Sequence, residues 1–215
     1  DVIMLDYQRA FDLVPFRKML AKVSSHGITG KVLNWIENWT MGRKQRCVLN
    51  GKHSTWRDVT SSVVQGSVLG PILFTIYIND LDLSIDPSYD ILISKFADDS
   101  KLGKCITKER DCETLQCALN SLIKWSIESG MRLHPDKCVV LHFGFNNPRH
   151  SYYIGDSRLT ECEEARDLGV LVTSDSSQTA HVENVARKAH AVLSQMKPTL
   201  TYRDSVVFAG IYRQY

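Results

Sequence analysis

The sequence predicts an α+β fold in which a mainly antiparallel sheet packs against helices. Short apolar runs typical of strands and longer runs with helical spacing follow one another irregularly, and an Asn-Gly pair at 50–51 marks a tight hairpin. A doubly wound fold would show strict strand–helix alternation instead. The 215 residues, 43% of them hydrophobic, can bury one substantial core or two modest ones.

Each element is predicted from a local pattern. The first residues are a short apolar run that ends in Asp6, as a buried strand would. Pro15 suits the first turn of a helix that Gly27 ends. The apolar run over 67–81 predicts a helix buried on most sides, too short to span a bilayer. The expected elements, in order, are a strand over 1–7, helices over 15–27 and from 30, a hairpin centred on 50–51, a helix over 67–81, a hairpin over 91–106, a helix over 108–128, short strands within 137–144, 151–155 and 167–172, and a helix over 179–196.

Charge and cysteine usage exclude some function classes. With 26 Lys and Arg against 24 Asp and Glu, the formal charge of +2 is too balanced for composition to indicate a nucleic-acid partner, so any basic surface must be local. The six cysteines include no C-x-x-C pair and no histidine at ligand spacing, which disfavours a structural zinc site. We expect neither a secretion signal nor a membrane span, and we expect a segment of a longer protein, because the chain starts in a core-like strand.

An acidic doublet follows one of the most apolar runs of the chain. Asp98 and Asp99 come directly after "ILISKF", and an unpaired carboxylate is costly to bury. Either the two carboxylates lie in a solvent-exposed surface turn, or a bound cation neutralises them. Asp6 also ends a predicted strand, so the two strands could lie side by side and bring their carboxylates together around Mg²⁺, which prefers hard oxygen ligands. Spacing alone leaves both interpretations open.

Five segments occur in an order that narrows the choice: "LDYQRAFD", "VVQGSVLGPILFTIYINDL", "KFADDSKLG", "GMRLHPDKC" and "DLGVLV". Together they resemble the palm of a reverse transcriptase, and are most similar to those of non-LTR (LINE, jockey-like) retrotransposons. The resemblance implies a partial palm over 1–175 without fingers, and the start of thumb or connection helices over 176–215. The fold it implies is a polymerase palm with an antiparallel sheet packed on helices, with fingers and thumb largely missing.

The resemblance also assigns roles to individual residues. Its catalytic and metal-binding acids are Asp6, Asp98 and Asp99, which would hold two Mg²⁺ ions, with Mn²⁺ as a substitute, and the Tyr7 carbonyl could add a ligand. Lys137 matches the lysine that protonates departing pyrophosphate. The remaining matches are Phe11, a gate against the 2′-hydroxyl of a ribonucleotide, Gln65 and Gly66 at the nucleotide site, and Leu168, Gly169 and Val170 at the primer grip.

Several of these residues also have structural interpretations. Ser67 is expected to cap the helix that follows it. Arg43, Lys44 and Arg46 could touch template phosphates or form a solvated charge cluster. Val64 stands where the family usually has a proline before Gln-Gly, which would loosen the loop that presents Gln65.

The function implied is template-directed addition of dNTPs to a primer 3′-hydroxyl by an RNA-directed DNA polymerase in retrotransposition. Its partners would be an RNA template, a DNA primer, dNTPs and the rest of the retrotransposon polyprotein, in the nucleus and cytoplasm. The alternative is a non-catalytic, decayed or co-opted fragment that at most binds nucleic acid.

Overall fold

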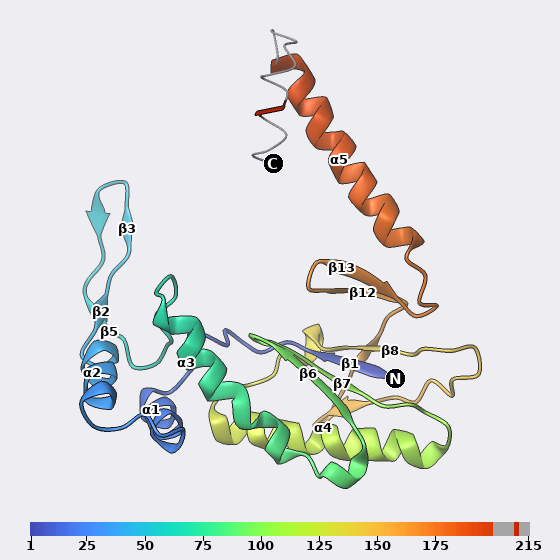
Figure 1. The fold of residues 1–215 in the computed structure, drawn as a ribbon, viewed down its shortest axis with the longest axis horizontal. Coiled ribbons are helices and arrows are strands. Elements are labelled where there is room, and N and C mark those ends of the chain that lie inside the picture. Colours follow the sequence, from blue (N-terminus) through green and yellow to red (C-terminus); the bar gives the residue numbers. More distant parts are fainter. Residues whose placement is uncertain (200–208, 211–215) are drawn as a thin grey trace. The chain divides into compact units, whose positions relative to one another are not determined.

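The computed structural model describes residues 1–199 and 209–210 and has the predicted α+β architecture (Figure 1). Contacts divide the chain into two compact units, Asp1–Cys162 and Glu163–Tyr215. The helices are α1 (Phe16–Ser25), α2 (Gly30–Thr40), α3 (Leu69–Ile78), α4 (Glu109–Ser129) and α5 (Thr179–Thr199), with short 3₁₀ turns η1 (Asn79–Ser84), η2 (Pro87–Tyr89) and η3 (Pro135–Lys137). In the described part of the chain, no helix is long and apolar enough to cross a membrane.

A five-stranded sheet organises the first unit. Its strands are ordered β11 (Thr160–Glu161), β8 (Val139–Leu141), β1 (Val2–Leu5), β7 (Asp99–Gly103) and β6 (Leu92–Phe96). Every neighbouring pair is antiparallel except β11 with β8, which is parallel. The mainly antiparallel sheet is therefore confirmed, with one parallel edge pair that local patterns could not reveal.

Alternation along the central strand decides which face of the sheet is buried. Ile3 and Leu5 of β1 are buried, whereas Val2 and Met4 are partly exposed. On the buried side lie the apolar positions of α4, which contacts β7 and runs along the sheet in Figure 1. The sheet thus has a covered face and a more accessible one, as antiparallel sheets commonly do.

The small strands form hairpins outside the sheet. Asn50 and Gly51 both have left-handed φ, +49° and +76°, as the two-residue turn between β3 and β4 requires. The strands are β3 (Val48–Leu49) with β4 (Lys52–His53), β2 (Lys44–Gln45) with β5 (Arg57–Asp58), β9 (Tyr153–Ile154) with β10 (Ser157–Arg158), and β12 (Glu164–Asp167) with β13 (Val170–Thr173). We call residues 43–58, which contain β2 to β5, the arm.

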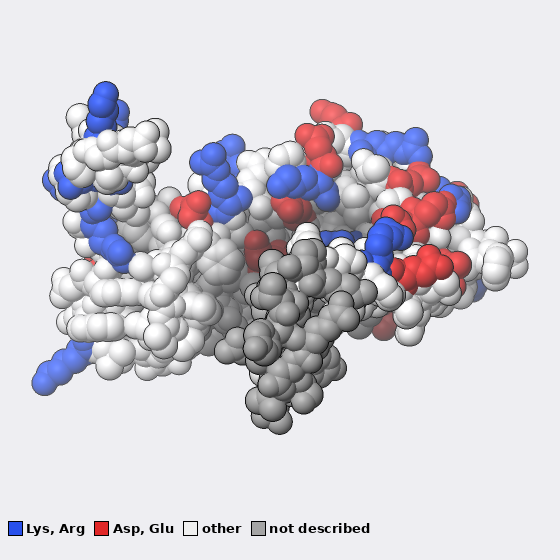
Figure 2. Space-filling model, turned by 90° about the horizontal axis from the view of Figure 1, so that it is seen from above, with Lys and Arg blue, Asp and Glu red and all other residues white. Residues whose placement is uncertain are grey.

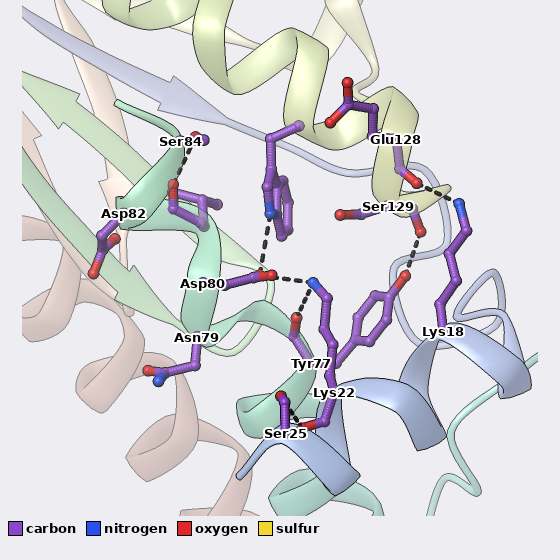
Figure 3. Close-up of polar contacts among 12 residues, drawn as sticks. Lys18, Lys22, Ser25, Tyr77, Asn79, Asp80, Asp82, Ser84, Glu128 and Ser129 are labelled. Atoms are coloured by element: carbon purple, nitrogen blue, oxygen red, sulfur yellow. Dashed lines mark hydrogen bonds and ion pairs between the residues drawn. The ribbon is translucent and has the colours of Figure 1, made fainter. Parts of the chain in front are cut away.

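A lysine–aspartate pair joins four helical segments, α1, α3, η1 and α4 (Figure 3). Lys22 of α1 places its Nζ 2.6 Å from Asp80 Oδ1 in η1 and 2.8 Å from the Tyr77 carbonyl of α3. Trp125 of α4 donates its indole N–H to the same Asp80 oxygen at 3.1 Å. The ammonium also lies over the Tyr77 and Trp125 rings, 4.4 and 5.0 Å from their centroids. Burial, with the Asp80 charge as a second cause, raises the pKa of Tyr77 to about 12.

The second unit is built from the β12–β13 hairpin and α5. Leu168 and Gly169 form the turn, with left-handed φ of +46° and +87°. The Leu171 amide donates to His181 Nδ1 of α5 at 3.1 Å, which fastens the helix to the hairpin. The predicted helix over 179–196 is confirmed and continues to Thr199.

The first turn of α4 depends on Asp111, and we expect its loss to lower the melting temperature at pH 7. One carboxylate oxygen of Asp111 accepts the Thr107 and Lys108 amides and the Thr107 hydroxyl at 2.8–2.9 Å. These hydrogen bonds, that of the Thr107 amide first, lower the pKa of Asp111 to about 2. Because the folded pKa lies below the unfolded one, the stabilisation is present above pH 4 and is lost as the pH falls toward 2.

Thermal melts of Asp111→Asn and of the wild-type chain between pH 7 and pH 2 measure the difference in melting temperature. That difference should shrink toward zero as the pH approaches 2. Glu113→Gln removes an exposed acid from the same helix and is the control. A gap between wild type and Asp111→Asn that stays constant down to pH 2 would contradict the assignment.

Candidate active site

The site is built where β1 ends. After Leu5, the chain is held on one side by residues 131–134: the His134 amide donates to the Asp6 carbonyl at 2.9 Å, and the Gln8 amide donates to the Arg132 carbonyl at 2.8 Å. On the other side β1 pairs with β7, with Leu5 opposite Ser100. Continuing that antiparallel register by one residue puts Asp6 level with Asp99, on the same face of the sheet.

The acidic doublet lies where the chain turns from β6 into β7, with Asp98 in the turn and Asp99 as the first residue of β7. Phe96 pairs with Asp99, so Ala97 and Asp98 are the two turn residues. Ala97 has a left-handed φ of +52°, a conformation that costs a non-glycine residue about 1–2 kcal/mol. Asp98 is partly exposed and Asp99 is exposed, so neither carboxylate is buried in the apolar core. The two strands that end in acids, β1 and β6, were predicted to lie side by side, and the structure corrects this: β7, which begins at Asp99, lies between them and pairs with both.

Lys137 lies beside the first acid. Its Nζ is 3.8 Å from Asp6 Oδ1, with side chains 59% and 44% exposed. An exposed pair at this distance adds little stability. The pair matters because of where it lies: η3 places Lys137, the predicted proton donor, at the end of β1.

The donor chemistry at this end of the sheet suits Mg²⁺. The candidate ligands are carboxylates, the hard oxygen donors that this ion prefers, and they lie at a solvent-accessible end of the sheet. Among the described residues, no three His, Cys, Asp or Glu side chains stand close enough together to hold a metal ion. The backbone therefore aligns Asp6 with Asp99 next to the turn, while the side chains do not converge into a three-ligand set.

The carbonyl of Tyr7 is directed toward the same place. Tyr7 lies opposite Leu133 in an isolated antiparallel bridge. The hydrogen bonds of this bridge are made by the residues on either side of the pair and not by Tyr7 and Leu133 themselves. In such a pair the residue's own N–H and C=O point away from the partner strand, which here is toward β7. The phenol is buried, and burial raises the pKa of Tyr7 well above its ordinary value.

Phe11 and Gln65 are brought together by two adjacent loops. The Val63 amide donates to the Phe11 carbonyl at 2.7 Å, and Gln65 Nε2 donates to Asp12 Oδ1 at 2.9 Å. The Phe11 ring is half-buried and stacks on Phe74 of α3, with centroids 4.1 Å apart. Phe11 therefore has a packing role whatever its part in nucleotide selection.

Asp12 was not among the predicted site residues. Its carboxylate orients the amide of Gln65, so it acts through Gln65 as a positioning residue. The sequence shows an acid directly after Phe11, but only the folded structure shows that this acid, Asp12, contacts Gln65.

The turn before α3 explains Ser67 and Gly70. Ser67 Oγ donates to the Val64 carbonyl at 2.6 Å and accepts the Gly70 amide at 3.0 Å. The prediction that Ser67 is the N-cap is wrong by one residue, because α3 begins at Leu69 with Val68 in the cap position, but Ser67 still accepts an amide of the first turn. A side chain at Gly70 would place Cβ 2.5 Å from the Val64 carbonyl oxygen.

We expect Gly70→Ala to displace the loop that carries Gln65 and to cost about 1–3 kcal/mol of stability, as overpacking generally does. Denaturant unfolding measures the loss of stability. Gly155→Ala is the control, because Gly155 lies at an exposed hairpin turn where an added Cβ would contact nothing. The difference between the two variants separates the steric clash at residue 70 from the general effect of replacing a glycine. Because Gly155 has a positive φ of +59°, that control carries backbone strain without a clash. A Gly70→Ala chain as stable as wild type would show that the turn yields at no cost.

The proposed primer-grip residues lie in the second unit. Leu168 and Val170 are 54% and 48% exposed, on either side of Gly169 at the tip of the β12–β13 hairpin. Exposed apolar side chains at a tight turn suit contact with another molecule.

A family model for the reverse transcriptase (RNA-dependent DNA polymerase) domain matches residues 2–201. The chain belongs to the reverse transcriptase family. The match covers all but the first residue of the first unit, the second unit as far as residue 201, and every candidate site residue, so the palm-like order of motifs in the sequence reflects membership of this family.

Similar proteins include polymerases of non-LTR elements. The RNA-directed DNA polymerase from mobile element jockey of Drosophila funebris is 26% identical over 94% of this chain and 23% of its own length. The probable RNA-directed DNA polymerase from transposon X-element of Drosophila melanogaster is 24% identical over 99% of this chain and 24% of its own. A Pol polyprotein from the type-1 retrotransposable element R2 of Popillia japonica is 26% identical over 66% of this chain. The chain spans about a quarter of the length of these relatives.

Proposed function

We propose that this chain is the catalytic palm of an RNA-directed DNA polymerase that adds dNTPs to a primer 3′-hydroxyl during retrotransposition. The observation that carries the proposal is the pairing of β1 with β7, which puts Asp6 level with Asp99 and beside the Asp98 turn in a member of the reverse transcriptase family. The jockey relative is named as an RNA-directed DNA polymerase and the X-element relative as a probable one, which supports the same activity here.

Asp6, Asp98 and Asp99 would hold Mg²⁺, with the Tyr7 carbonyl as a further oxygen. When bound, a pair of Mg²⁺ ions supplies the positive charge that lowers the pKa of the primer hydroxyl and neutralises the leaving pyrophosphate. The chain's own part is to present the carboxylates at an accessible end of a rigid sheet. Short side-chain movements from the aligned backbone positions would bring them together.

The incoming nucleotide is proposed to lie against the loops of Phe11 and Gln65. The Gln65 amide, held by Asp12, would contact the nucleotide, and Gly66, with a φ of +78° and open space around it, lets the backbone come close. The Phe11 ring would exclude a 2′-hydroxyl. Lys137 Nζ would give a proton to the departing pyrophosphate oxygen, as a general acid.

The short span of this chain in its relatives supports a role within a larger polypeptide. Residues 1–175 would act as the palm, with Leu168, Gly169 and Val170 positioning the primer terminus, and residues from 176 onward would begin the thumb. Template RNA, primer and dNTPs would be held jointly with the remainder of the polyprotein, in the nucleus and cytoplasm.

The test is primer extension on poly(rA)/oligo(dT) with dTTP and Mg²⁺ or Mn²⁺. The chain is assayed both alone and within a longer polypeptide that restores the regions its relatives have beyond it. Extension by the longer polypeptide supports the proposal. Absence of extension from a folded polypeptide that binds primer-template would favour the non-catalytic alternative.

A further inference from the structure

One turn of the chain, residues 134–138, contacts Asp6 at three places. This turn contains η3 and lies beside the end of β1. The Asp6 carbonyl accepts the His134 amide at 2.9 Å, and the Asp6 carboxylate lies 3.8 Å from Lys137 Nζ. The third contact is made by a side chain, because the Asp6 amide donates to Cys138 Sγ at 3.4 Å. The turn therefore holds the backbone of Asp6 on both sides of the carbon that bears the carboxylate.

The Cys138 sulfur takes the place of a backbone acceptor. In an antiparallel strand the N–H and C=O of one residue point to the same side, and for Asp6 that side faces the turn. The pairing of β1 with β8 ends where Met4 lies opposite Val139, and the chain before Val139 forms η3 instead of a strand. The Asp6 amide thus donates to a thiol where a longer β8 would offer a carbonyl.

The thiol is fixed in place by its surroundings. Cys138 is fully buried, and its own amide donates to the His134 and Pro135 carbonyls at 3.1 and 3.2 Å. Its Sγ also lies 3.8 Å from the Asp6 carbonyl oxygen, to which the S–H donates weakly. A thiol buried in this way is chemically inert, so its contact with Asp6 suits a positioning role and not a redox or nucleophilic one.

Charge pairing alone would hold Asp6 loosely. Figure 2 shows Asp, Glu, Lys and Arg side chains at the surface, several of them next to one another. The pair of Lys137 with Asp6 is exposed in the same way, with side chains 59% and 44% accessible, and solvent weakens such a pair. The contact with the buried Cys138 sulfur lies away from solvent, so it constrains the backbone of Asp6 where the ion pair does not.

We propose that Cys138 is a positioning residue for the polymerase reaction, and that it holds Asp6 with its carboxylate level with Asp99. This inference rests on the proposed function. Asp6 follows the last paired residue of β1, so an amide without its acceptor would let residue 6 rotate and carry the carboxylate away. Removing a group that orients a metal ligand typically costs 10- to 100-fold in metal affinity or activity. Cys138 acts only through Asp6.

The test compares variants that remove or keep the acceptor. Cys138→Ala removes it, and Cys138→Ser keeps a polar acceptor at the same position. Cys112→Ala is the matched control, because it removes a thiol from another buried position, on α4. Cys138→Val removes the acceptor but fills the space, and it takes the place of Cys138→Ala if that variant does not fold.

Three measurements follow the variants. Hydrogen exchange of the Asp6 amide, measured by NMR on the 215-residue chain, should be faster in Cys138→Ala than in the wild type. The Mn²⁺ dissociation constant of the same chain, measured by electron paramagnetic resonance, should rise about 10-fold. The Mg²⁺ concentration for half-maximal primer extension by the longer polypeptide should rise by a similar factor. Cys138→Ser should recover most of each change, and Cys112→Ala should behave as the wild type.

The outcomes separate this inference from the proposed function. Wild-type metal dependence in Cys138→Ala would overturn the inference alone, as would a Cys138→Ser variant that is equally impaired or an equal change in Cys112→Ala. A wild-type polypeptide that binds Mn²⁺ but extends no primer would contradict the proposed function, and the Mn²⁺ constants of the variants would still decide the role of Cys138. A wild-type chain that binds no Mn²⁺ would overturn both.

Discussion

Asp98→Ala is expected to lower primer extension by at least about 100-fold while leaving the fold intact. Losing one preorganised electrostatic group at a reacting centre typically costs 100- to 1,000-fold in rate. Asp98 occupies a partly exposed turn, so its truncation removes no core packing. The assay is the extension reaction on poly(rA)/oligo(dT) in the longer polypeptide.

Asp156→Ala is the matched control for this variant. Asp156 also occupies a two-residue turn, between β9 and β10, and is exposed. If Asp98 only decorates its turn, the two variants should have the same activity. Equal activity would contradict the polymerase assignment of Asp98.

A second readout separates metal binding from turnover. An ion present at ten times its dissociation constant stabilises the folded state by about 1.4 kcal/mol. For a chain of this size that raises the melting temperature by roughly 3–5 °C. Wild type and Asp156→Ala should show this gain on adding Mg²⁺ or Mn²⁺, and Asp98→Ala should lose most of it.

Asp80→Ala is expected to cost about 2 kcal/mol of stability without touching the proposed catalytic groups. It removes the acceptor shared by the Lys22 ammonium and the Trp125 indole N–H (Figure 3). Leaving donors without their acceptor costs about 1–3 kcal/mol for a buried group. We expect a loss of about 2 kcal/mol, below the upper end of this range, because the Asp80 side chain is 37% exposed and water partly replaces the lost acceptor. The melting temperature should fall by roughly 4–8 °C.

The neighbouring Asp82→Ala tests whether the shared acceptor matters. Asp82 lies on the same 3₁₀ turn, pairs with Lys95 at 2.9 Å and is 48% exposed, so its loss should cost only about 0.2–1 kcal/mol. Lys22→Met keeps an unbranched side chain against the rings, and a double-mutant cycle with Asp80→Ala isolates the ion pair. Equal losses for Asp80→Ala and Asp82→Ala would show that the contact with Trp125 adds nothing.

The fold class and most elements were accessible from local sequence patterns. Periodicity located α4 and α5, and the Asn50-Gly51 pair located the hairpin of the arm, because turn geometry and apolar spacing are properties of neighbouring residues. The parallel pairing of β11 with β8 was not accessible, since strand order depends on contacts between residues distant in sequence.

The sequence by itself determined the family and the identity of the candidate acids, because motif order along a chain needs no coordinates. The tertiary structure alone decided that Asp6 lies level with Asp99, that Lys137 reaches Asp6, and that Asp12 holds Gln65. It also decided that the four strands of the arm are exposed. The reason is physical: propensity and periodicity act between near neighbours, whereas register, burial and charge pairing arise only when distant segments meet.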